Sequence, residues 1–199
     1  MHRVRYNRKT SPQVKGGKVQ NKNNRRLTLK RGFIIDRASP RKGFSHLVTK
    51  QDILAFIELI PNWRAALDGI ERILLSDGSD NLDGRYLSFR REKSGIIRIS
   101  AWPTDLAMAI RKDYFEAHRS IFEKIELSYE RKKDGVMCWF DKPKAKAFML
   151  VHVFLHELGH HRDFMLRDDI SSGEPYAEGF AKKMEDEIWA KYVAKFGKP

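Results

Sequence analysis

The chain of 199 residues contains 41% hydrophobic and 33% charged residues, a balance typical of a soluble globular protein and not of a membrane or fibrous one. It has no apolar run near the roughly 20 residues that cross a membrane and no apolar segment behind its basic N-terminus that would mark a secretory signal. A single cysteine, Cys138, excludes an internal disulfide, as is usual in a reducing cytosol. From these three features we expect a cytoplasmic protein with no membrane partner.

The formal net charge of +13 is concentrated at the N-terminus. Residues 1–43 contain 14 Lys or Arg and one acid, Asp36, whereas the remaining residues carry 25 basic and 25 acidic side chains, which cancel. This asymmetry predicts a flexible basic arm over residues 1–43 and a single folded domain over residues 44–199. The arm is interpreted either as a tether to nucleic acid or another polyanion, or as a solvated tail without a specific partner. Within it, residues 33–35 could dock on the domain as a short strand.

Two helices are predicted at the start of the domain. A capping pattern at Thr49 begins a helix that ends before Pro61, and Asn62 begins a second helix whose apolar positions continue to Leu74. The segments that follow are a turn-rich loop at residues 76–84 and two strands at residues 86–89 and 95–102.

A third helix is expected from a cap at Thr104 to about His118. The weak alternation of residues 122–129 favours a strand, and the turn signal at residues 132–135 leads into a short apolar strand at residues 136–140. That strand lies directly before the most informative stretch of the sequence.

This stretch contains the pattern H-E-x-x-H, with His156, Glu157 and His160. It falls in a predicted helix over residues 144–167, in which apolar side chains recur at helical spacing. Two histidines four residues apart lie one turn apart on the same helix face, so both can bind one metal ion. Glu157 can then act on a water molecule beside the metal. The alternative is a buried helix whose histidines are hydrogen-bonded without a metal.

A catalytic zinc site usually has a third protein ligand and an open position for water. The third histidine expected for a metzincin is absent, because residue 166 is leucine. Instead, a final helix is predicted from Glu174 to about Lys195, with Pro175 in its first turn. Its first residues place Glu174 and Glu178 on one face, one turn apart.

The motif Glu174-x-x-Ala177-Glu178 resembles the second helix of gluzincin metallopeptidases, and the resemblance covers about residues 136–185. The most similar members are small cytosolic zinc peptidases of the ImmA/IrrE type and other minimal gluzincins. The resemblance implies that Glu174 binds Zn²⁺ and that Glu178, where the family usually has aspartate, orients a ligand histidine. Glu178 remains an alternative ligand. Three acids after His160 are weaker alternatives: Asp163, Asp168 and Asp169.

Four other side chains near these motifs are candidates for supporting roles. His152 lies one turn before His156 and is a candidate for the cleft or for a structural role in the core. Tyr176 is a second cleft candidate, because its hydroxyl could stabilise an oxyanion. His161 points away from His160 and is expected to support the site or to lie on the surface. Cys138, in an apolar strand, is expected to pack in the core.

The resemblance and the motif together predict an α+β fold of the zincin-like type. In it, a small, mostly antiparallel or mixed sheet packs on helices, and H-E-x-x-H lies on a central helix. The predicted function is a zinc-dependent peptidase that acts on a peptide or protein, with Glu157 as general base. By analogy with the family, residues 136–140 would offer a strand edge to the substrate. Two alternatives are a catalytically silent interaction module of the same fold and a protein tethered to nucleic acid by its basic arm.

Overall fold

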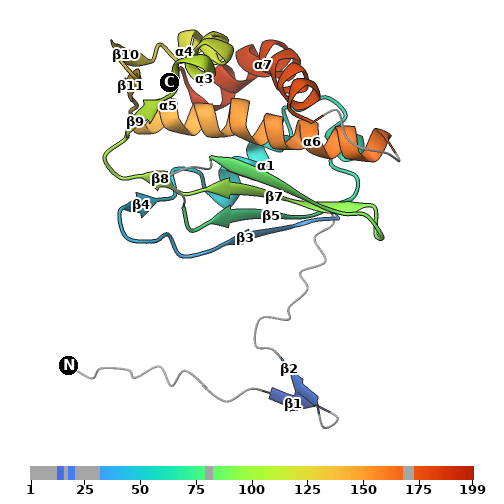
Figure 1. Ribbon diagram of the computed structural model, residues 1–199. Coiled ribbons are helices and arrows are strands. Elements are labelled where there is room, and N and C mark those ends of the chain that lie inside the picture. The colour runs from blue at the N-terminus through green and yellow to red at the C-terminus, as the bar shows by residue number, and fades with distance from the viewer. Residues whose placement is uncertain (1–12, 16–17, 21–31, 79–82, 168–172) are drawn as a thin grey trace, which may run out of the picture.

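The computed structural model describes residues 13–15, 18–20, 32–78, 83–167 and 173–199 (Figure 1). The strands are β1 Gln13–Lys15, β2 Lys18–Gln20, β3 Ile34–Arg37, β4 Phe44–Ser45, β5 Ile70–Ser76, β6 Gly84–Phe89, β7 Ser94–Ser100, β8 Trp102–Pro103, β9 Ala107–Ile110, β10 Ser128–Lys132 and β11 Gly135–Trp139. The helices are α1 Lys50–Ile57, α2 Trp63–Ala66, α3 Lys112–Ala117, α4 Arg119–Lys124, α5 Lys142–Ala147, the π-helical segment η1 Phe148–Phe154, α6 Leu155–Leu166 and α7 Glu174–Phe196. None of the helices in these ranges is both long and apolar enough to cross a membrane.

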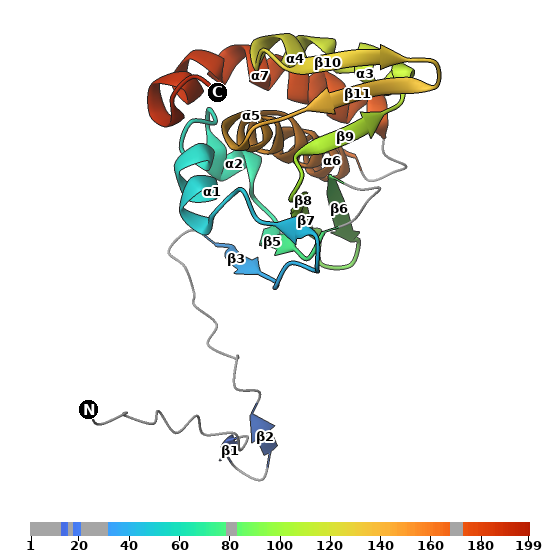
Figure 2. The same cartoon turned by 90° about the vertical axis from the view of Figure 1, so that its left-hand side faces the viewer.

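The main sheet is mixed and has the order β3-β5-β7-β6. Strands β3, β5 and β7 are parallel, and β6 lies antiparallel to β7 at one edge. Alternate apolar residues of the two central strands point to the same face, where they are fully buried: Ile73 and Leu75 in β5, and Ile97 and Ile99 in β7. The helices pack on this face, as Figures 1 and 2 show. The fold is therefore α+β with a mixed sheet packed against helices, as the sequence predicted.

A single long helical segment crosses above the sheet. It begins at α5, where the side chain of Asp141 accepts a hydrogen bond from Lys144 N–H and caps the helix, and it continues through η1 into α6. All seven side chains of η1 are buried, because the sheet lies below the segment and α7 lies on its other side (Figure 1). The predicted helix over residues 144–167 is confirmed, and the wide π-helical turns lie directly before His156.

The folded body begins earlier than residue 44. Strand β3 pairs in parallel with β5, and Phe33 and Ile35 are buried, so the segment suggested as a docking strand belongs to the main sheet. Strands β1 and β2 pair with each other in antiparallel fashion. Residues 1–12, 16–17 and 21–31 of the predicted basic arm lie outside the described residues.

The second predicted helix is wrong over most of its length. Helix α2 ends at Ala66, and Ile70–Ser76 forms the internal strand β5. Gly69 provides the reason: its φ of +84° ends the helical path, and a Cβ atom there would lie 2.9 Å from the backbone oxygen of Lys93. The apolar residues after Gly69 suit a strand or a helix, and pairing with β3 and β7 decides between them.

Two further elements differ from their predictions. The third helix begins at Lys112, because Ala107–Ile110 pairs with β11 as β9; Thr104 donates its hydroxyl to the backbone oxygen of Gly43 instead of capping a helix. The strand predicted at residues 122–129 is wrong in its first part, where α4 runs to Lys124. Its buried residues have helical spacing, and only β10 is extended.

The predicted strand at residues 136–140 exists as β11 but is not an edge. It lies between β10 and β9 in a separate three-stranded antiparallel sheet, so both of its sides are paired. It cannot offer a free edge to an extended substrate. The edge strands of the main sheet are β3 and β6, and of these two β6 contributes residues to the cleft described below.

Helices α6 and α7 approach each other closely at Gly159. A Cβ atom on Gly159 would lie 2.7 Å from Ala177 Cα and 2.9 Å from the backbone oxygen of Ala177. Glycine is therefore required in the interior of α6, although it lowers helix propensity, because it lets α7 bring Glu174 and Glu178 against the histidines of α6. The close contact explains the only interior glycine of the predicted helix.

We expect Gly159→Ala to lower the free energy of unfolding by about 1–3 kcal/mol, because the added methyl group must push α7 away from α6. Gly179→Ala is a matched control on α7. Gly179 is exposed, and a Cβ atom added there would have no neighbouring atom within 4 Å, so this change should stabilise the protein by up to about 1 kcal/mol. Urea denaturation of both variants measures the difference. Equal stability of the two variants would contradict the close helix contact.

Candidate metal centre

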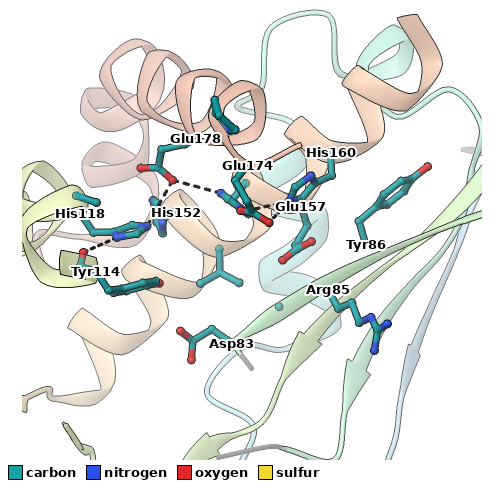
Figure 3. A pocket seen from close by; sticks show the side chains of 15 residues that line it. Asp83, Arg85, Tyr86, Tyr114, His118, His152, Glu157, His160, Glu174 and Glu178 are labelled. Atoms are coloured by element: carbon teal, nitrogen blue, oxygen red, sulfur yellow. Dashed lines mark hydrogen bonds and ion pairs between the residues drawn. The ribbon is translucent and has the colours of Figure 1, made fainter. Parts of the chain in front are cut away.

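An open cleft of about 850 Å³ lies where α6, α7, α3 and the edge strand β6 meet (Figure 3). Most of its polar side chains come from the two predicted motifs, from residues 83–86 and from residues 114–118. The residues that line it include Asp83, Gly84, Tyr86, Tyr114, His118, His152, His156, Glu157, His160, Glu174 and Glu178.

Three predicted ligands meet at this cleft. His156 Nε2 and His160 Nε2 are 3.1 Å apart, Glu174 Oε2 lies 3.1 Å from His156 Nε2, and Glu174 Oε1 lies 3.5 Å from His160 Nε2. Ligand atoms bound to one tetrahedral zinc ion at 2.0–2.2 Å are about 3.3–3.6 Å apart. The three measured distances lie within about 0.2 Å of this range, so the three side chains are close enough together to hold one metal ion.

Glu178 approaches the same histidine from its other side. Its Oε2 lies 3.3 Å from His156 Nδ1 in an ion-pair contact. His156 Nδ1 is buried and has no hydrogen-bond partner among the described residues. Burial alone would raise the pKa of Glu178, but the contacts with His118 and His156 outweigh it and hold that pKa well below its usual range. Glu174 thus faces the Nε2 atoms of both histidines, whereas Glu178 faces the outer nitrogen of His156.

The acidic surroundings favour a positive charge at this position. Burial alone would lower the pKa of His156, yet Glu178, Glu157 and Glu174 together raise it. The pKa of His160 is lowered by burial and by the neighbouring His156. Protonating both adjacent imidazoles is unfavourable, because the two positive charges repel each other. A divalent cation can supply the positive charge that the acidic groups favour, while both imidazoles stay neutral.

Glu157 lies at the floor of the cleft and is 6% exposed. Burial raises its pKa to about 7, against the effect of His156, which favours the charged form. Gly84 makes room for this side chain, because a Cβ atom at that position would lie 2.7 Å from Glu157 Oε1. A carboxylate with a pKa near neutrality can both accept and return a proton.

The remaining predicted candidates are placed as follows. His152 is 3% exposed and has both suggested roles: it lines the cleft, and its Nδ1–H donates to Glu185 Oε1 over 2.7 Å. Burial, the largest influence, lowers the pKa of His152 despite that contact. Tyr176 is not among the described residues that line the cleft. Asp168 and Asp169 lie outside the described residues.

Three other residues have structural contacts. His161 is fully buried and not on the surface: its Nε2–H donates to the backbone oxygen of Asp68 over 2.7 Å, and its Nδ1 accepts from the Tyr86 hydroxyl over 3.0 Å. Asp163 accepts from the backbone N–H of Gly173 and pairs with Arg167. Cys138 is buried in β11, where burial raises its pKa to about 11, as expected for a thiol in the core.

Three further polar residues, which the sequence motifs do not assign to the site, also line the cleft. Tyr114 and His118 stack on each other one turn apart, with ring centroids 3.8 Å apart. Asp83, in the loop predicted as a simple turn, lines the opposite wall, and burial raises its pKa to about 6. These residues are far from H-E-x-x-H in the sequence, and the one available signal was the spacing of Tyr114 and His118 on one helix face.

Comparison of the chain with protein-family models, with curated proteins and with solved structures found no match.

Proposed function

We propose that the protein is a zinc-dependent peptidase with a zincin-like active site, in which His156, His160 and Glu174 hold the metal. The observation that carries this proposal is the 3.1–3.5 Å spacing of their donor atoms, next to a buried Glu157 that is not needed as a ligand. When bound, zinc lowers the pKa of a coordinated water toward neutrality and polarises a carbonyl oxygen.

Glu157 performs the proton transfers. Its carboxylate takes a proton from the attacking water and holds it, because burial raises its pKa to about 7. It then returns the proton to the nitrogen of the leaving amine, which cannot depart as an anion. Glu178 holds His156 through Nδ1, so that Nε2 stays turned toward the metal.

Strand β6 is the proposed platform for the substrate. It is the edge strand of the main sheet nearest the cleft, and Gly84 and Tyr86, which line the cleft, belong to it. An extended peptide can add to such an edge through backbone hydrogen bonds, which places a peptide bond beside Glu157. This role replaces the one expected for residues 136–140.

Tyr114 is the proposed donor to the substrate oxygen. Burial, together with Asp83 and Glu178, raises the pKa of its hydroxyl, so the group stays protonated and available to donate a hydrogen bond. It takes the role suggested for Tyr176, since Tyr114 lines the cleft.

Metal removal tests the proposal. We expect the purified protein to cleave members of an unstructured peptide library, to lose that activity after treatment with a chelator, and to regain it when about one equivalent of Zn²⁺ is added back. Mass spectrometry of the products measures cleavage. Cleavage that continues at the same rate in chelator-treated protein would contradict a zinc mechanism.

A further inference from the structure

A second group of metal-binding side chains lies behind the first. His118, at the junction of α3 and α4, His152 on η1 and Glu178 on α7 bring one donor atom each to within 4.8 Å of one another. His118 is 9% exposed and His152 is 3% exposed. Figure 3 shows the Glu178 carboxylate between His118 and the H-E-x-x-H helix, so the second group shares a wall of the cleft with the first.

Both histidines are oriented as metal ligands usually are. Nδ1–H of His118 donates to the backbone oxygen of Tyr114 over 2.6 Å, and Nδ1–H of His152 donates to Glu185 Oε1 over 2.7 Å. Each ring therefore keeps its Nε2 lone pair for another partner. A buried acceptor behind a ligand histidine fixes the tautomer and the direction of the ring in just this way.

The donor atoms of His118 and Glu178 favour a positive charge between them. With Nδ1–H of His118 donating to Tyr114, its Nε2 lies 3.4 Å from Glu178 Oε2, and two acceptors face each other there unless a proton or a metal ion lies between them. The buried carboxylate of Glu185 is partly neutralised by Lys124, whose Nζ lies 3.8 Å from Glu185 Oε2. Among the described residues, no lysine ammonium lies at a similar distance from the Glu178 carboxylate. His118 is buried and the Glu178 side chain is 32% exposed, so two acceptors that face each other here are costly unless a positive charge lies between them.

We propose that His118, His152 and Glu178 form a second site for a divalent transition-metal ion of the Zn²⁺ class. Two imidazoles and one carboxylate suit zinc, whereas Mg²⁺ and Ca²⁺ prefer oxygen ligands throughout. The site is separate from the first, since Glu178 contacts His156 at Nδ1 and the first site uses Nε2. The ion joins α7, η1 and the α3–α4 junction, so it fixes the wall that carries Glu178. The proposal does not depend on peptidase activity.

Zinc titration of the metal-free full-length protein tests it, with isothermal calorimetry and elemental analysis as readouts. The wild-type protein should bind about two equivalents of Zn²⁺. His118→Gln should bind about one equivalent, because it removes a ligand of the second site only. His46→Gln is the matched control: His46 Nε2 donates to the backbone oxygen of Ala38, away from both clusters, so this variant should bind as the wild type does.

A double variant separates this inference from the proposed function. His156→Ala/His160→Ala removes the first site and should still bind about one equivalent of Zn²⁺. It also carries the test if His118→Gln fails to fold, as judged by circular dichroism. The second site is overturned, and the first left intact, if three results occur together. The wild-type protein binds about one equivalent of Zn²⁺, His118→Gln binds as much as the wild type, and the double variant binds none. In that case a proton shared by His118 and Glu178 replaces the cation.

Discussion

Glu157→Gln is expected to lower the rate of peptide hydrolysis by about 100- to 10,000-fold while leaving zinc binding unchanged. Glutamine has nearly the same shape as glutamate but cannot take a proton from water or return one to the leaving amine. Glu157 is not one of the three groups whose donor atoms converge, so its loss should not release the metal. Single-turnover cleavage of a peptide found in the library measures the rate, and elemental analysis measures zinc.

The control for this variant is Glu187→Gln, which makes the same chemical change at an exposed position on α7. It should retain the wild-type rate. Normal cleavage by Glu157→Gln would exclude the proposed general base. Zinc-loaded wild-type protein that cleaves no peptide in the library would favour the alternative of a catalytically silent interaction module.

Glu174→Ala is expected to weaken zinc binding at the first site far more than Glu178→Gln does. Glu174 supplies an oxygen on the Nε2 side of both histidines, whereas Glu178 only contacts the outer nitrogen of His156. Loss of an acceptor behind a ligand histidine lowers metal affinity by about 10- to 100-fold, and loss of a ligand should exceed that range.

Both variants are best compared in the His118→Gln background, because Glu178 also belongs to the second group and the measured affinity then reports the first site alone. Competition with a chromophoric chelator gives the zinc affinities. The reverse order, with Glu178→Gln the weaker binder, would make Glu178 the third ligand and Glu174 a surface carboxylate; Glu174 is 78% exposed.

Local patterns were sufficient to predict the parts of the site that one helix supplies. The four-residue spacing of His156 and His160 places both imidazoles on one face of α6 whatever the rest of the chain does. Thr49 and Asp52 form the predicted capping box at the start of α1, again through contacts within four residues. Such features depend on backbone geometry alone.

Elements that depend on distant partners were harder to predict. The residues of β5 suit either a helix or a strand, and they form a strand because β3 and β7 pair on both sides. Residues 107–110 become extended because β11, about thirty residues later, pairs with them. A single sequence does not show which segments will lie side by side.

The same limit applies to the cleft. Tyr114 and His118 approach H-E-x-x-H only because α4 packs against η1 and α3 packs against α4. Asp83 does so because β6, which follows it directly, lies against α6. The role of Gly159 also needs the structure, since the residue that requires its small size, Ala177, lies on another helix. The sequence therefore predicted the centre of the site better than its walls.

The most direct test of the central claim is to locate zinc in the purified full-length protein by anomalous X-ray diffraction at the zinc edge. We predict a zinc ion about 2.0–2.2 Å from His156 Nε2, His160 Nε2 and a Glu174 oxygen, with a further coordination position facing Glu157. Zinc-loaded crystals in which these three side chains hold no metal, or lie too far apart to share one, would contradict the account.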